Sequence, residues 1–139
     1  MKRSDFIELS DLRIDEAKIL LDAGRYQGSY YLAGYAVECA LKACIAKQTK
    51  QHDFPPNKKV VEAVYTHDLE KLMKSVGLEL ALNNALAADS TLEAHWSVVK
   101  SWNENYRYEQ DISESAARNL YTAMTDHNHG VLTWLKKYW

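Results

Sequence analysis

The sequence predicts an all-α protein, an antiparallel up-and-down helical bundle. Its 139 residues include only five glycines and two prolines, and so few helix-breaking residues favour long helices. Apolar residues recur at helical spacing along most of the chain, whereas no stretch alternates polar and apolar residues with the period of two that a half-buried strand requires. We expect four main helices with short helical inserts, in one domain that spans residues 1–139.

Two long helices are expected in the first half of the chain. The first covers residues 4–23 and carries two apolar stripes. We expect one stripe, at helical spacing, to face the core: Leu9, Leu12, Ile19, Leu20 and Ala23. The other repeats every seven residues on a different side and indicates a partner surface: Ile7, Ile14 and Leu21. Gly24 stands where a C-terminal cap is expected, and the second helix, residues 26–50, is apolar nearly all round and therefore central.

A polar loop and two short helices are expected next. The loop covers residues 48–59 and contains the two adjacent prolines. A short helix follows over residues 66–77, with Thr66 as its N-cap and Gly77 as its end. Another short helix is expected over residues 80–88.

Two longer helices complete the predicted bundle. Ser90 and Glu93 have the spacing of a capping box, so a helix is expected to start near Thr91. The side chains that it should turn inward are Leu92, Trp96, Val99 and Tyr106. The last helix is expected from Glu114 to the C-terminus. Its inner stripe is Ala116, Leu120, Ala123, Met124, His127, Val131, Trp134 and Leu135.

The composition argues against several classes of protein. A net charge of −2 and a pI near 6.2 give no bulk electrostatic reason for tight binding to nucleic acid or membranes. No apolar run approaches the roughly 18 to 20 residues that span a bilayer, and the N-terminal residues do not resemble a secretory signal. Cys39 and Cys44 would point about 140° apart around their helix, so no disulfide is expected between them. We expect a cytoplasmic protein with two buried thiols.

Motifs for metal or cofactor chemistry do not occur in the sequence. The five histidines lack the spacing of zinc ligands, and His127 and His129 would lie about 160° apart on a helix. Neither glycine-rich phosphate-binding pattern is present, and neither is a nucleophile elbow. We expect no cofactor and no metal site.

An arginine between two tyrosines forms the first candidate ligand site. The segment SWNENYRYEQD, residues 101–111, is expected to end a long helix with Tyr106, Arg107 and Tyr108. Arginine grips phosphate with two hydrogen bonds, and tyrosine rings offer faces on which a base can stack. The same residues can instead finish a helix, with the arginine stem over the rings and its charge paired with Glu109. Sequence favours the structural interpretation, and the binding interpretation stays open.

A charged pair in the most apolar stretch of the chain forms the second candidate. Glu38 and Lys42 stand four residues apart, in the order that favours an ion pair within a helix. Tyr31 and Tyr35 lie within about 40° of the same direction, so the four residues make one polar-aromatic strip. The strip is interpreted either as a structural ion pair with its neighbours or as a surface that faces a ligand, opposite the arginine of the first candidate.

Three segments of the sequence resemble the HEPN domain family, named for higher eukaryotes and prokaryotes nucleotide-binding. They are residues 6–48, THDLEKLM at 66–73 and WNENYRYE at 102–109. The most specific parts are RYQGSYYLAGYAVECALKA, residues 25–43, and the HDL of the second segment. The resemblance implies a bundle that forms a homodimer and, in many prokaryotes, pairs with a small nucleotidyltransferase in a toxin–antitoxin or defence system. The polar-aromatic strip would then face a cleft or the partner subunit.

Many HEPN proteins are metal-independent ribonucleases, and this sequence does not contain their motif. The motif is an arginine followed, after four to six positions, by a histidine. No histidine occurs in the eight residues after Arg107, and Arg118 and His127 are separated by eight residues. The resemblance therefore does not imply nuclease activity here. Family members without the motif are regarded as nucleotide-binding or as non-catalytic partners of the transferase.

The first hypothesis is a dimeric, non-catalytic binding module for a nucleotide or RNA, with a nucleotidyltransferase as a further partner. Arg107 would hold phosphate, and Tyr106 and Tyr108 would stack on bases. Glu38 and Lys42 would line the cleft, together with the tyrosines of the strip.

Two alternatives remain open. One is an enzyme, a divergent metal-independent ribonuclease in which the arginine works with a histidine such as His67 or His95. The other is a scaffold dimer whose polar-aromatic strip binds only a partner protein. The sequence does not decide whether the chain is an enzyme.

Overall fold

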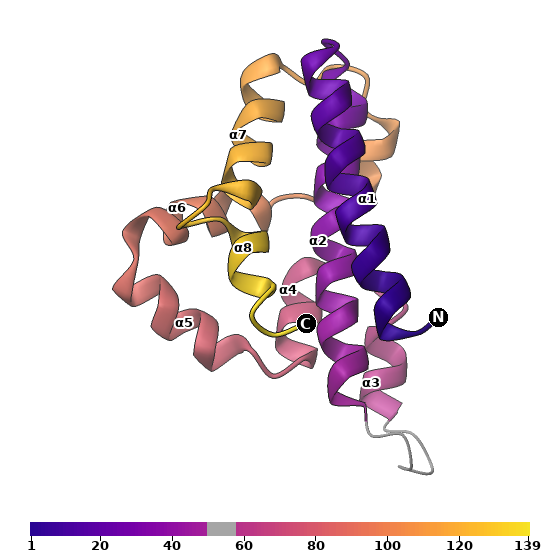
Figure 1. Ribbon diagram of the computed structural model, residues 1–139, viewed down its shortest axis with the longest axis vertical. Helices are drawn as coiled ribbons and strands as arrows, with labels where there is room; N and C mark the ends of the chain where they lie inside the picture. The colour runs from indigo at the N-terminus through magenta and orange to yellow at the C-terminus, as the bar shows by residue number, and fades with distance from the viewer. Residues whose placement is uncertain (50–57) are drawn as a thin grey trace.

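A computed structural model describes residues 1–49 and 58–139, and within these ranges the protein consists of helices without strands (Figure 1). The elements in chain order are α1 (Arg3–Asp22), α2 (Tyr26–Gln48), α3 (Lys58–Ala63), α4 (Leu69–Ser75), α5 (Glu79–Ala88), α6 (Ser90–Val99), the 3-10 helix η1 (Glu104–Tyr108), α7 (Glu114–Thr125) and α8 (Val131–Leu135). The predicted all-α bundle with short helical inserts is confirmed. Most of the loop predicted at 48–59 lies outside the described residues, and α3 was not predicted.

Helix α2 is the centre of the bundle. It contacts α1, α4, η1, α7 and α8, and most of its residues from Ser29 to Ile45 are buried. Its small residues let neighbours approach closely. A Cβ atom on Gly34 would lie only 2.2 Å from the ring of Trp102, so the buried indole rests directly on the helix backbone. This close approach fixes the start of the segment that leads to η1.

Helices α1 and α2 form an antiparallel hairpin held by buried hydroxyl groups. Gly24 adopts a φ of 75° after α1, as expected of a glycine that ends a helix. Ser10 Oγ donates a hydrogen bond to the Ala36 carbonyl at 2.8 Å, and Ser29 Oγ donates to the Ala17 carbonyl at 2.7 Å. These small side chains let the two helix backbones lie close together along their length.

The stripe of α1 predicted to face the core is the wrong one. The buried residues are Ser10, Ile14, Ala17 and Leu21, which include two members of the seven-residue stripe. Leu12 and Ile19, predicted to be in the core, are 49% and 67% exposed. The serine and alanine beside the seven-residue stripe make a narrow face that fits against the small residues of α2. The buried face of α1 is therefore the one whose small side chains allow a close approach of the α1 and α2 backbones, and not the more hydrophobic one.

The long C-terminal helix predicted from Glu114 is interrupted. The Asp126 carboxylate accepts hydrogen bonds from the backbone amides two and three residues later, at 3.0 and 2.8 Å, and closes a turn. A Cβ on Gly130 would lie 2.5 Å from the Met124 carbonyl oxygen, so only glycine fits this turn. His127, predicted to lie in the inner stripe, is exposed in the turn. The rest of the stripe other than Ala116 is buried: Leu120, Ala123, Met124, Val131, Trp134 and Leu135.

Aspartates cap the helices for which serine or threonine was predicted. Asp68, not Thr66, caps α4 by accepting from the Lys71 amide at 3.0 Å. Asp89, not Ser90, caps α6 and accepts two backbone amides. A carboxylate forms stronger hydrogen bonds to helix N-terminal amides than a hydroxyl does, and it also complements the positive end of the helix dipole.

The cysteines are free and buried, as predicted. Burial raises the pKa of both thiols, Cys39 and Cys44, to about 11. Both therefore stay protonated and unreactive at neutral pH.

A separate property concerns membranes. Among the residues that the structure describes, no helix has the length and apolar character needed to cross a bilayer.

Candidate functional site

The Tyr-Arg-Tyr segment, residues 106–108, does not end a long helix as predicted. Helix α6 ends at Val99, and the chain then turns at the buried Trp102, which packs on Gly34 of α2. The Asn103 side chain accepts from the backbone amide two residues later at 2.9 Å and starts η1. The segment is therefore a short 3-10 turn on the surface of α2, positioned by a tryptophan anchor just before it.

The three side chains of this turn play different parts. The Tyr106 ring packs edge-on against Tyr30, with centroids 4.7 Å apart, and is half-buried. Gln27 Nε2 donates to the Tyr106 carbonyl at 3.0 Å. The Arg107 guanidinium lies 4.7 Å from the centroid of the Tyr108 ring, and that ring is 70% exposed. Tyr106 is thus an anchor, while the next two residues present a cation and an aromatic face to solvent.

The guanidinium of Arg107 is not paired with a carboxylate in the part of the chain that the structure describes. Among the described residues its side chain makes no ion pair, and the predicted partner Glu109 does not reach it. Arg118, a surface arginine on α7, is by contrast paired with Glu114 at 2.9 Å. The first arginine therefore keeps its hydrogen-bond donors free for a ligand.

The predicted pair between Glu38 and Lys42 is present and buried. Glu38 is 1% exposed, and its Oε1 accepts from Lys42 Nζ at 2.8 Å. The same oxygen lies 2.8 Å from His67 Nδ1. Glu38 Oε2 is buried and has no hydrogen-bond partner among the described residues. A carboxylate this deep in the bundle requires the cation beside it, because an unpaired buried charge is strongly destabilising.

His67 connects the buried carboxylate with the surface. Its side chain is 46% exposed although Nδ1 is hydrogen-bonded to Glu38. In a neutral ring this bond keeps the proton on Nδ1 and leaves Nε2 as an acceptor. The next residue of the HDL motif, Asp68, caps α4. The carboxylate in an apolar stretch was the sequence signal for this contact, because such a group needs a polar partner.

The tyrosines of the polar-aromatic strip form a covered aromatic wall. Tyr31 stacks with Tyr35 at 6.4 Å and with Trp102 at 6.0 Å between ring centroids. The guanidinium of Arg13 lies 5.9 Å from the Tyr35 ring. Burial, followed by the nearby Cys39 and Glu38, raises the pKa of Tyr35. These rings support the site from behind, and other side chains already occupy their faces.

The two candidate sites lie at different levels of α2. Gln27 contacts the backbone of residues 106 and 107, whereas Glu38 contacts His67. Eleven residues of helix separate Gln27 from Glu38, about 16 Å along the axis. The structure therefore does not bring the arginine into contact with the carboxylate, and residues 102–108 run along α2 between the two levels.

A polar pocket of about 440 Å³ opens between the start of α4 and residues 100–105. Its lining includes His67, Lys71, Lys100, Trp102 and Asn105. The Trp102 Nε1 atom is buried and has no hydrogen-bond partner within the described ranges. The pocket thus joins the buried Glu38–His67 pair to the segment that carries the arginine.

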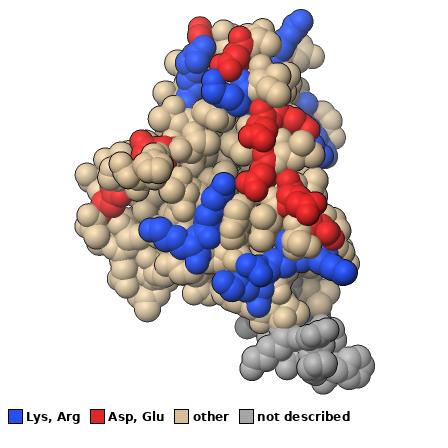
Figure 2. All heavy atoms as spheres, viewed as in Figure 1, with Lys and Arg blue, Asp and Glu red and all other residues tan. Residues whose placement is uncertain are grey.

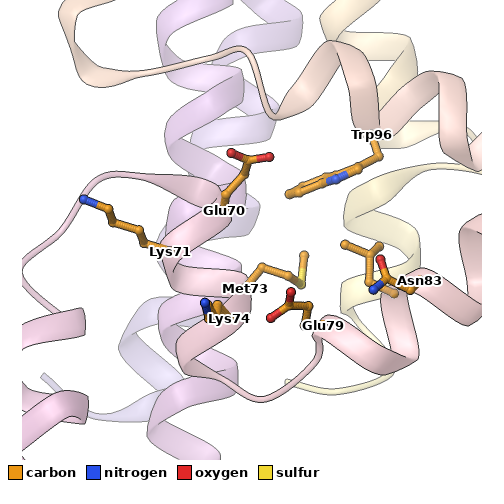
Figure 3. Close-up of a pocket in the computed structure, with 8 residues that line it drawn as sticks. Glu70, Lys71, Met73, Lys74, Glu79, Asn83 and Trp96 are labelled. Carbon is orange, nitrogen blue, oxygen red and sulfur yellow. The ribbon is translucent and has the colours of Figure 1, made fainter.

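A second pocket, of about 300 Å³, lies between α4, α5 and α6 and contains none of the predicted site residues (Figure 3). Its floor is apolar and includes Met73, Leu82 and Trp96, all buried. Figure 3 shows the Glu70 side chain on the Trp96 side of this pocket and Lys71 extending away from it. Glu70 and Lys71 line both this pocket and the polar pocket, so α4 lies between the two.

One face of the molecule is unsuited to nucleic acid. Figure 2 shows carboxylates in a line over α1. The helix carries six acidic residues, Asp5, Glu8, Asp11, Asp15, Glu16 and Asp22, against three basic ones, Arg3, Arg13 and Lys18. Three of these carboxylates are paired with cations, Glu16 with Arg13, Asp22 with Lys18 and Asp11 with Lys136, so phosphates would meet a modest net negative charge over α1.

The sequence profile of the HEPN domain matches residues 4–137. This chain belongs to the HEPN family. Neither a comparison with curated proteins nor one with solved structures gives a match. HEPN domains are nucleotide-binding or of the ribonuclease type, so a free arginine and a polar pocket are the features of this HEPN bundle that bear on function. Within the described ranges, no group of three or more His, Cys, Asp or Glu side chains is placed to hold a metal ion.

Proposed function

We propose that this HEPN domain is a non-catalytic module that binds a nucleotide or RNA, with Arg107 on a phosphate and Tyr108 against a base. The observation that carries the proposal is the pair itself, a guanidinium 4.7 Å from the centroid of an exposed ring, with no carboxylate of the described residues in an ion pair with it. Arginine over an aromatic face suits both phosphate binding and base stacking.

The backbone of this site is held in place before any ligand arrives. The Tyr106–Tyr30 contact and the Gln27 hydrogen bond hold η1 against α2, and the buried Trp102 fixes the chain just before it. Binding then orders two side chains and little backbone, which keeps the entropic cost low. The proposed part of Tyr106 is to support the turn, since Tyr30 already covers part of its ring.

The proposed assembly is a homodimer that associates with a nucleotidyltransferase, in a toxin–antitoxin or defence setting. Support comes from the family and from the apolar side chains that α1 leaves on the surface. Leu12 and Ile19 are exposed on the helix face opposite the core, and exposed apolar patches commonly mark protein interfaces. Sedimentation of the purified protein would show whether two copies associate.

The test of the binding function is a fluorescence-anisotropy titration of labelled single-stranded RNA. Arg107→Ala should weaken binding at least tenfold and lower the slope of log Kd against log salt by about one, as expected for a lost phosphate contact. Arg118→Ala is the matched control, because this arginine is exposed but already paired with Glu114. Equal affinity of the two variants would refute the site.

A second candidate function is metal-independent RNA cleavage, and the Glu38–His67 hydrogen bond favours it. A histidine oriented by a carboxylate can act as a general base. His67 would take the proton of a ribose 2′-hydroxyl, whose oxygen would attack the adjacent phosphorus. The bond to the 5′-oxygen would break, leaving a cyclic phosphate, and the leaving oxygen would take a proton from water.

Cleavage of labelled RNA in the presence of a chelator tests this candidate. Activity should vanish in His67→Ala and persist in His95→Ala, whose ring bonds the His129 carbonyl instead. Nuclease-free protein that leaves RNA intact would refute the cleavage function and leave the binding function standing.

A further inference from the structure

We propose that the polar pocket beside His67 is a nucleoside subsite adjoining the Arg107–Tyr108 surface, so that the ligand is RNA of at least two linked nucleotides. This inference rests on the proposed binding function and adds a ligand class to it. The volume of about 440 Å³ lies within the range of roughly 300 to 1,000 Å³ typical of small-ligand sites. Such a pocket can take one nucleoside.

The pocket is built from side chains that the fold has fixed. Glu38, 1% exposed, holds His67 through Nδ1 and leaves the rest of the ring at the pocket wall. Trp102 also lines the pocket through its ring, and its Nε1 is buried with no hydrogen-bond partner among the described residues.

The chemistry of the lining matches a ribonucleoside and its phosphate. Lys71 and Lys100 supply positive charge for a phosphate, and Lys71 extends from the side of α4 away from the neighbouring pocket (Figure 3). Asn105 and Glu104 offer an amide and a carboxylate to base edges and ribose hydroxyls. Two further carboxylates line the pocket: that of Asp68 is engaged in capping α4, and Glu70 also lines the neighbouring pocket.

The pocket and the arginine surface are continuous. Asn105 lines the pocket and stands two residues before Arg107 on the same 3-10 helix. The two sites are spread over about 16 Å of α2, from the level of Gln27 to that of Glu38. This span exceeds one nucleotide, and modules that bind single strands contact about four nucleotides or more. A ligand that reaches from His67 at the far wall of the pocket to Arg107 is therefore longer than a mononucleotide.

The experiment compares ligand length and site in one titration series. Affinities for AMP, the dinucleotide ApA and tetra-adenylate RNA are measured for the unchanged protein, Lys100→Ala, Arg107→Ala and the control Lys137→Ala, an exposed lysine outside the pocket. Tetra-adenylate should bind at least tenfold more tightly than AMP. Lys100→Ala should remove most of that advantage and leave AMP affinity unchanged, whereas Arg107→Ala should weaken both ligands.

The possible failures are distinguishable. Equal affinity for AMP and tetra-adenylate, or a Lys100→Ala variant that matches Lys137→Ala, would overturn the nucleoside subsite while the binding function stands. Absence of binding by all three ligands would overturn the binding function itself. Deoxy-tetra-adenylate that binds as tightly as the RNA would overturn the assignment to RNA, since ribose hydroxyls would then contribute nothing.

Discussion

Polar side chains beside the middle and beside the start of α2 lie in opposite environments. Near its middle, the buried Glu38 pairs with Lys42, 12% exposed, and with His67, 46% exposed, and the carboxylate depends on these partners. Near its start, η1 is held through Tyr106 and the backbone, while Arg107 and Tyr108 remain exposed. The charges near the middle of α2 contribute to the stability of the fold. The arginine near its start does not, and the fold only holds it in place at the surface. Substitutions should therefore separate stability from binding.

The largest expected effect is loss of the buried carboxylate. Glu38→Ala leaves Lys42, only 12% exposed, without its counter-charge and should lower the free energy of unfolding by about 3–5 kcal/mol. Urea denaturation measures this change. Glu38→Gln, which keeps the shape and one hydrogen-bond acceptor, should cost less. A loss below about 1 kcal/mol in Glu38→Ala would show that the cluster of Glu38, Lys42 and His67 contributes little to the stability of the fold.

Helix α1 offers the same contrast between a buried and an exposed residue of one type. Ile14→Ala should cost about 2–4 kcal/mol, because Ile14 is buried against α2. Ile19→Ala should change stability by less than about 0.5 kcal/mol, because its side chain is exposed. Thermal unfolding of both variants decides which stripe faces the core. A larger loss of stability in Ile19→Ala than in Ile14→Ala would show that the face predicted from sequence is the buried one.

Trp102 packs on Gly34 between these two regions of α2, and a substitution at the glycine should disturb this contact. Gly34→Ala places a methyl group 2.2 Å from the Trp102 ring, so the indole must shift. We expect a loss of about 1–3 kcal/mol together with a change in tryptophan fluorescence. Gly28→Ala is the control, since its new Cβ would meet only the end of the flexible Leu20 side chain at 3.2 Å. Similar losses in both variants would contradict the anchor.

A smaller effect concerns pH. The hydrogen bond to Asp89 raises the pKa of His129 above its ordinary 6.5, and the same bond lowers the pKa of Asp89 below its ordinary 3.8. The stabilising contribution of His129 is complete below pH 6.5 and is lost as pH rises through its raised pKa. That of Asp89 is complete above pH 3.8 and is lost as pH falls through its lowered pKa.

Stability measured from pH 6 to 9 should therefore decline in the unchanged protein and decline less in His129→Asn. His95, whose Nδ1 bonds the His129 carbonyl, and Asp126, whose pKa the same turn lowers, are kept in both proteins. Parallel pH profiles would show that the Asp89–His129 pair contributes nothing to stability.

The smallest effect on stability is expected at the binding surface. Arg107→Ala removes an exposed side chain whose guanidinium lies over the exposed Tyr108 ring, so stability should change by less than about 0.5 kcal/mol. Circular dichroism during heating measures it. A larger loss would mean that the arginine helps to hold η1, and the loss of binding in this variant would no longer report on the ligand site alone.

The sequence predicted the helices better than the way they pack. Helical spacing was enough for α1 and α2, but it could not tell which stripe of α1 fits against the small residues of α2. The break at Asp126 and Gly130 had a local signal, an aspartate whose side chain can close a turn before a glycine. It was outweighed by the apolar periodicity on both sides.

The candidate site also contains features that were predictable from the sequence and others that were not. The Glu38–Lys42 pair was predictable because both residues lie on one helix turn. His67 is 29 residues away in sequence, and only tertiary structure brings it to the carboxylate. The arginine and its tyrosines were recognised as a unit, whereas the 3-10 conformation of η1 depends on the contact of Trp102 with Gly34, which no local pattern reveals.

The most direct test of the account is photo-crosslinking with RNA that carries 5-iodouridine, followed by mapping of the modified peptide. If Arg107 and Tyr108 bind RNA, an adduct forms on Tyr108, disappears in Arg107→Ala and remains in Arg118→Ala. An adduct on α1, or on another surface away from η1, would contradict it.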